Sequence, residues 1–110
     1  MRYADVMGTP TYLTMAEAMN DLKRRGFTAD FEPIGKMLHA AGSERTFQPD
    51  ELTIVEHHRF EGASDPEEMA VVYVLEARDG TRGVLIDAYG VYANPDLSVF
   101  LQDVRMQENV

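Results

Sequence analysis

The chain has 110 residues, no cysteine and a formal net charge of −9 at pH 7. This length favours a single domain, and the lack of cysteine excludes disulfides, thiol nucleophiles and cysteine-bound zinc. The negative charge repels phosphates and anionic lipid headgroups, so we expect no nucleic-acid partner and no membrane partner. Neither a secretory signal nor a run of about 18 apolar residues is present. These features predict a cytoplasmic protein.

One α+β domain is expected over residues 13–106. Residues 1–12 show neither a helical nor a strand period, and we interpret them as a tail or leading loop. Residues 107–110 are expected to fray.

The first helix is predicted over residues 15–25. Thr14 is a suitable N-cap, and Glu17 three residues later completes a capping-box pattern. Gly26 supplies the left-handed residue that ends many helices, and Phe27 can fold back over the last turn.

The segment 28–41 follows no simple period. Pro33 cannot donate a hydrogen bond to a sheet and is best tolerated on an edge strand. We therefore expect an extended segment and leave open whether it adds a fourth strand. Residues 42–50 are expected to form a loop.

Three strands are predicted next, over 52–60, 69–77 and 83–91. Asp79-Gly80 lies between the last two, and this dipeptide is typical of a two-residue type I′ hairpin turn. Such a turn places Leu75 opposite Val84 and fixes which side chains share a face. A register with this pairing divides the two strands into two sets. The expected core face holds Met69, Val71, Tyr73, Leu75, Val84, Ile86 and Ala88, and the opposite face holds Ala70, Val72, Val74, Leu85, Asp87 and Tyr89.

The last helix is predicted to start after Asn94, with Pro95 at its first position. Its apolar positions recur at helical spacing and are Leu97, Phe100, Leu101 and Val104. The predicted fold is thus a small antiparallel meander of three to four strands, with an N-terminal and a C-terminal helix packed on one face.

This arrangement leaves one sheet face uncovered. Val72, Val74 and Leu85 lie on it, and exposed apolar patches often mark association surfaces. We therefore expect a homodimer through this face or a groove that it lines. The alternative is that loops or the N-terminal tail cover it.

Asp87 is the most suggestive candidate site residue, because a carboxylate in an apolar strand is costly unless it has a partner. Tyr89 is expected beside it, and His57 or Arg59 can join them if the first strand pairs suitably. These four residues, Asp87, Tyr89, His57 and Arg59, are the candidate ligand-binding or interface residues. An acid/base site is one interpretation. The other is an Asp87 that is hydrogen-bonded within a dimer interface.

Arg59 supports a small anionic ligand, since its guanidinium binds phosphate or carboxylate through two N–H groups. A cross-strand ion pair is the alternative role for this side chain. The three histidines have no zinc spacing, and no phosphate-binding glycine loop or nucleophile elbow is present. We therefore predict no metal and no cofactor.

Five stretches of the chain also carry a resemblance. They are GFTADF at 26–31, FQPDEL at 47–52, RFEG at 59–62, SDP at 64–66 and GVLIDAYGVY at 83–92. Together they resemble a family of small bacterial proteins of about a hundred residues from Bacteroidetes-type genomes. Members are often labelled phosphoribosylpyrophosphate synthetase by automatic transfer. The family implies no site residues, and the ribose-phosphate loop of the larger true synthetases has no counterpart here, so we expect no synthetase activity.

The function expected from the sequence is therefore a non-enzymatic binding module. It would act as a homodimer and bind a small anionic ligand or another protein. The alternative is a small enzyme, or a domain that processes a phosphate or sugar ligand, using Asp87 and Tyr89.

Overall fold

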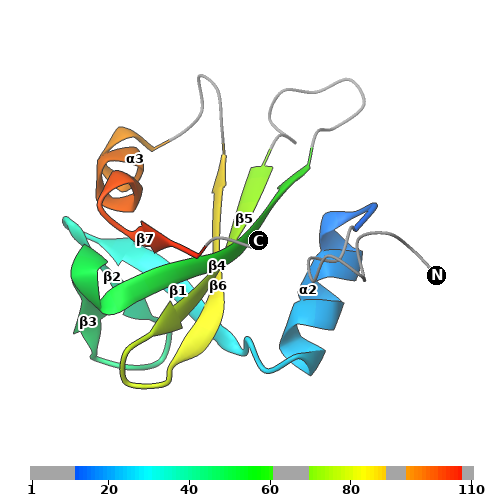
Figure 1. Ribbon diagram of the computed structural model, residues 1–110, viewed down its shortest axis with the longest axis horizontal. Coiled ribbons are helices and arrows are strands. Elements are labelled where there is room, and N and C mark those ends of the chain that lie inside the picture. Colours follow the sequence, from blue (N-terminus) through cyan, green and yellow to red (C-terminus); the bar gives the residue numbers. More distant parts are fainter. Residues whose placement is uncertain (1–11, 61–69, 89–93, 108–110) are drawn as a thin grey trace.

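A seven-stranded sheet forms the centre of the molecule (Figure 1). The computed structural model describes residues 12–60, 70–88 and 94–107. The strands are β1 (Ala29–Ile34), β2 (Met37–Ala40), β3 (Thr46–Phe47), β4 (Leu52–Phe60), β5 (Ala70–Ala77), β6 (Arg82–Ala88) and β7 (Arg105–Met106). A 3₁₀ turn, η1 (Pro49–Glu51), precedes β4, and the two helices are α2 (Met15–Arg24) and α3 (Pro95–Gln102).

The sheet is mixed and curls strongly into a half-barrel. Its strand order is β3-β2-β1-β6-β5-β4-β7, with parallel pairing of β1 to β6 and of β4 to β7. The α+β class is confirmed, but the predicted meander of three to four strands is too small. Residues 28–41 form a hairpin, β1–β2, whose tight turn starts at Gly35 with φ +59°. The expected loop over 42–50 contains β3 and most of η1.

The junction of β1 with β6 depends on a glycine. Gly83 pairs with Ala29, and a Cβ atom built on Gly83 would lie 2.2 Å from the Ala29 carbonyl oxygen. Any side chain at position 83 would therefore push β1 away. This close approach joins the β1–β2–β3 hairpins to the central strands.

Helix α2 is built as the sequence predicts. Thr14 caps it by accepting a hydrogen bond from the Glu17 amide at 3.1 Å. At the other end Gly26 has φ +102°, and the Phe27 amide donates to the Leu22 carbonyl at 2.9 Å. This is the Schellman pattern, which turns the chain sharply into β1.

Helix α3 is also capped as expected. The Asn94 side chain accepts from the Asp96 and Leu97 amides at 3.0 and 3.3 Å. Pro95 occupies the first helical position.

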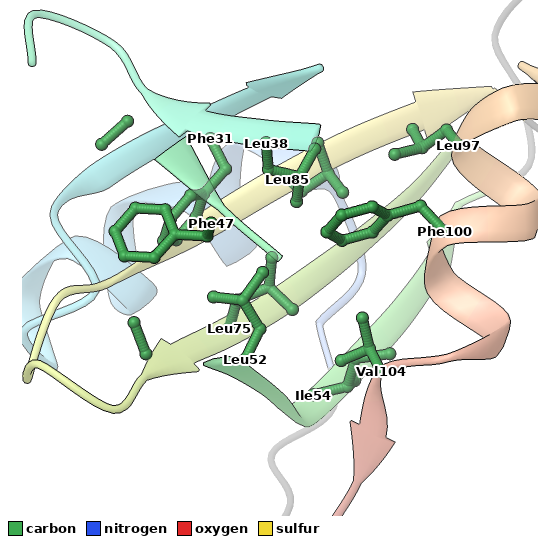
Figure 2. Close-up of a cluster of buried hydrophobic side chains, with 12 residues drawn as sticks. Phe31, Leu38, Phe47, Leu52, Ile54, Leu75, Leu85, Leu97, Phe100 and Val104 are labelled. Atoms are coloured by element: carbon green, nitrogen blue, oxygen red, sulfur yellow. The ribbon is translucent and has the colours of Figure 1, made fainter. Parts of the chain in front are cut away.

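The two helices cover opposite faces of the sheet (Figure 1). The smaller core lies under α2 and contains Ala18, Leu22, Phe27, Val72, Val74 and Val84. The larger core lies inside the half-barrel, where α3 closes it (Figure 2). Its members include Phe31, Leu38, Phe47, Ile54, Leu75, Leu85, Leu97, Phe100 and Val104.

This arrangement corrects the expectation that both helices share one face. Val72 and Val74 are fully buried under α2, and Leu85 is buried in the larger core. Among the described residues, the three side chains on which the homodimer was predicted are therefore covered by the protein itself. A curled sheet has two apolar faces to cover, and one helix is used for each.

The β5–β6 register also differs from the prediction by one residue. Leu75 lies opposite Gly83 rather than Val84, because the hairpin loop has three residues. Gly80 is the only residue of this loop with a positive φ, +95°, whereas a type I′ turn would need one at Asp79 too. The slip moves Val84 to the α2 face. Asp87 pairs with Val71 and so lies on the α3 face, not beside Val72 and Val74.

A β-bulge between Ile54 and Glu56 changes which side chains of β4 point to each face of the sheet. Before it, Leu52 and Ile54 point into the larger core. After it, Glu56 and His58 pair opposite Val74 and Val72 and share the α2 face. His57 and Arg59 consequently lie on the α3 face.

The helices of the described part of the chain are too short to cross a membrane.

Candidate functional site

Four polar side chains lie on one face across three neighbouring strands. His57 pairs with Tyr73, and Arg59 pairs with Val71, which in turn pairs with Asp87. Residues that pair across a sheet share a face, so β4, β5 and β6 present these groups together. We call His57, Arg59, Tyr73 and Asp87 the polar face.

Asp87 is the carboxylic acid of this group, and its side chain is half-buried. Its carboxylate accepts a hydrogen bond from the Asn94 amide at 3.4 Å, which places it beside the start of α3. Burial raises the pKa of this carboxyl, although the Asn94 and Ala88 backbone groups act in the opposite direction. In its protonated form this carboxyl can donate as well as accept hydrogen bonds.

Tyr73 connects the polar face to the core. Its ring packs against the larger core, and its half-buried hydroxyl has a raised pKa. Burial is the main cause, the Asp87 charge adds to it, and the Arg59 charge opposes it. The hydroxyl thus lies within the electrostatic influence of both Asp87 and Arg59.

The two remaining groups are exposed. His57 and Arg59 both lie in the C-terminal half of β4, and both are exposed. Arg59 also interacts with other groups of the protein.

The structure therefore brings together three of the four sequence candidates, namely Asp87, His57 and Arg59. The fourth, Tyr89, lies outside the described residues. Tyr73 was missed, because the predicted register placed it on the face opposite Asp87. The length of the hairpin loop decides this, since a three-residue loop sets Tyr73 and Asp87 on the same face.

A second polar cluster lies under α2 and was not predicted. Arg25 donates to both carboxylate oxygens of Glu56, with an Nη1–Oε1 distance of 3.2 Å. The His58 Nε2 lies 2.9 Å from the same Oε1. The Tyr12 hydroxyl donates to Asp21 and accepts from Arg25 at 3.0 Å. We call these five residues the α2 clasp.

The α2 clasp is the most buried set of charges that the structure describes. Glu56 and His58 are only 8% and 9% exposed. Burial alone would raise the pKa of Glu56, but its bonds to His58 and Arg25 outweigh this effect and lower it. Burial, with the hydrogen bond to Asp21, raises the pKa of Tyr12 to about 12. Each charged group of the cluster has a hydrogen-bond or ion-pair partner. We therefore interpret the α2 clasp as a structural attachment of α2 to the sheet.

The described residues contain no group of three or more histidine, aspartate and glutamate side chains placed to hold a metal ion. The polar face instead offers a guanidinium, an imidazole, a phenol and a carboxyl whose pKa is raised by burial. Such groups can bind a polar ligand through hydrogen bonds, and Asp87 can exchange a proton with it.

No protein-family model, curated protein or solved structure matches this chain.

Proposed function

We propose that this protein is a binding module for a small anionic ligand that carries hydroxyl groups, such as a sugar phosphate. The polar face is the proposed site. The observation that carries this proposal is the alignment of Arg59, Tyr73 and Asp87 on one face of β4, β5 and β6.

The spacing of the strands suits a ligand of this size. Strands lie about 4.8 Å apart, so Arg59 on β4 and Asp87 on β6 are separated by roughly 10 Å across the sheet. Arg59 would receive the anionic group, because its planar fork matches two oxygens at once. Tyr73 and Asp87 would bind hydroxyl groups at the other end. His57 lies two residues before Arg59 on the same face of β4, so its imidazole would contact the anionic group beside the guanidinium.

The burial of Asp87 favours a second candidate function. A carboxyl with a raised pKa lies closer to the pH at which a general acid or base works. In this alternative the protein is a small enzyme, and Asp87 moves a proton on the bound ligand. The two candidates separate cleanly, since turnover of the ligand is expected only for the second.

Amide NMR titrations test the proposed site. The probes are ribose 5-phosphate, ribose and inorganic phosphate, each at millimolar concentration. Ribose 5-phosphate follows from the sequence resemblance, and the other two separate its two chemical parts. We expect saturating shifts at His57, Arg59, Tyr73 and Asp87 that are largest for the sugar phosphate. Shifts spread over the whole surface, or none at these four residues, would refute the proposal.

Self-association stays a prediction without its original basis, because the surface that suggested it is buried. Sedimentation equilibrium decides it by measuring the mass, which is 12.4 kDa for one chain.

A further inference from the structure

A pocket of about 500 Å³ lies between α3, the β1–β2 turn and the start of η1, and its lining shares no residue with the polar face. The helix forms one wall through Asp96, Val99, Phe100 and Asp103. These positions follow the i, i+3, i+4, i+7 spacing of a single helix face. The volume falls within the range of small-molecule sites, about 300 to 1,000 Å³.

The opposite wall comes from distant parts of the sequence. Lys36 is contributed by the turn of the β1–β2 hairpin, and Gln48 and Pro49 come from the start of η1. The pocket thus exists only because α3 closes the half-barrel beside these two turns.

Three of the lining residues, Pro49, Val99 and Phe100, are apolar. Phe100 is buried and belongs to the larger core, so it is a fixed surface. Val99 is 61% exposed, which makes it one of the most exposed large apolar side chains that the structure describes. Together with Pro49 it offers contact to an apolar ligand body.

The carboxylates of Asp96 and Asp103, near the two ends of α3, favour a cationic ligand. Asp96 and Asp103 lie about 10 Å apart along the helix, at a rise of 1.5 Å per residue. Neither carboxylate forms an ion pair within the described ranges. Two carboxylates and the single ammonium of Lys36 give the pocket a net charge of one negative unit.

Asp103 is the more informative of the two acids. It is the C-cap residue of α3, at the end of the helix where the carbonyl groups concentrate partial negative charge. A carboxylate is unfavourable in that place, and a bound cation would relieve both the side chain and the helix end. The acidic balance of the whole chain further attracts cations.

We propose that this pocket binds a small organic cation with an apolar body, namely an amine whose hydrocarbon part is aromatic or branched. Its ammonium group binds Asp103 at the C-terminal end of α3. Its body lies over Val99 and Phe100 against Pro49. This site is independent of the polar face, and each of the two can be tested while the other fails.

The test uses the 110-residue chain and a matched pair of probes. 2-Phenylethylamine carries the cation, and 2-phenylethanol has a similar shape without the charge. Amide NMR titration is expected to give saturating shifts at Gln48, Val99, Phe100 and Asp103 with the amine, and weaker binding of the alcohol. Equal binding of the two probes would overturn the proposal, as would shifts of the amine at Tyr73 and Asp87 in place of the pocket.

Three variants complete the test. Asp103→Asn is expected to weaken amine binding roughly two- to fivefold, the range for an exposed ion pair, and to leave alcohol binding unchanged. Asp96→Asn removes the charge of the other carboxylate that lines the pocket and tests its contribution to amine binding in the same way. Glu44→Gln removes an exposed acid that does not line the pocket and should bind the amine like the parent. Unchanged amine affinity in both aspartate variants, or equal weakening in Glu44→Gln, would rule out a specific cation site.

Discussion

Arg25, the C-cap residue of α2, forms a two-pronged ion pair with Glu56 on β4. The Glu56 side chain is only 6% exposed, whereas that of Arg25 is 32% exposed. Glu56 reaches this position because the bulge after Ile54 turns it toward α2. The pair therefore links a helix end to an irregularity in the sheet, and it makes the attachment of α2 sensitive to single charges.

Removal of the Arg25 charge should destabilise the protein strongly. Arg25→Met leaves the Glu56 carboxylate buried without its two-pronged partner, and breaking a buried pair in this way costs about 3–5 kcal/mol. Because Arg25 is partly exposed, we expect about 2–3 kcal/mol of lost unfolding free energy. Urea denaturation measures it. The matched control is Arg24→Met, one residue earlier, where the side chain is 74% exposed and a loss below about 1 kcal/mol is expected. Equal losses in the two variants would contradict a structural role for the α2 clasp.

The stability of the protein should fall at acid pH through the α2 clasp. The pKa of Asp21 is lowered, mainly by its bond from Tyr12, and that of Glu56 is lowered below its ordinary 4.5. A carboxyl with a lowered folded-state pKa stabilises the fold above its unfolded pKa and loses this contribution as the pH falls through the folded value. Unfolding free energy should therefore decline below about pH 4.5. A flat profile down to pH 2 would contradict it.

A second loss is expected at alkaline pH. The pKa of Tyr12 rises from 10.0 to about 12 in the folded protein. A raised folded-state pKa gives stabilisation that is complete below the unfolded value and disappears as the pH rises through the folded value. Stability should thus fall between pH 10 and 12, and Tyr12→Phe should flatten this part of the profile. Identical alkaline profiles in the parent and the variant would show that Tyr12 does not titrate as the structure indicates.

Asp87→Asn should stabilise the protein at neutral pH. Burial raises the Asp87 pKa, so ionisation of this carboxyl costs folding free energy as the pH rises through the folded value. Asparagine keeps an acceptor for the Asn94 amide without the charge, and a gain of up to about 1 kcal/mol is expected at pH 7. The gain should disappear below pH 3.8, the ordinary aspartate value, where both side chains are neutral. A destabilised variant at pH 7 would mean that Asp87 is a structural carboxylate, as in the interface interpretation.

Gly83→Ala should be severely destabilising. The added Cβ would meet backbone atoms of Ala29 at 2.2 and 2.7 Å, and the backbone of a paired strand cannot move aside as a flexible side chain can. We expect a loss of about 2–4 kcal/mol or a failure to fold. Gly42→Ala is a useful control, because a Cβ there meets nothing within 4 Å and only the cost of its φ of +83° applies. Equal effects at the two positions would show that the β1–β6 approach is looser than described.

The local signals in the sequence predicted both helices and the extent of β4. Thr14, Gly26 and Asn94 act through contacts with near neighbours in the chain, so their roles can be inferred without knowledge of the fold. The β1–β2 hairpin was missed as a pair of strands because Pro33 disturbs the alternation of side chains. The parallel pairing of β1 with β6 connects residues more than 50 positions apart. The sequence indicates it only through Gly83, which has no side chain and therefore allows another strand to approach closely.

The candidate site was predictable in part for the same reason. Asp87 and Arg59 stand out by residue type, yet their relation depends on register. One residue in the Arg78–Gly80 loop and one bulged residue near Val55 decide which side chains share a face. Both irregularities shift the facing by one position, and neither has a compelling signal in a single sequence. The α2 clasp escaped prediction through this same bulge.

The most direct test of the proposed function follows the Asp87 carboxyl itself. Its side-chain ¹³C signal is recorded against pH in the free protein and with saturating ribose 5-phosphate. We predict a midpoint above 3.8 in the free protein and a displaced midpoint with the ligand, because the ligand would contact this carboxyl. A midpoint that is the same with and without the ligand, together with no ligand-induced shift at Arg59 or Tyr73, would contradict the assignment of the polar face as the binding site.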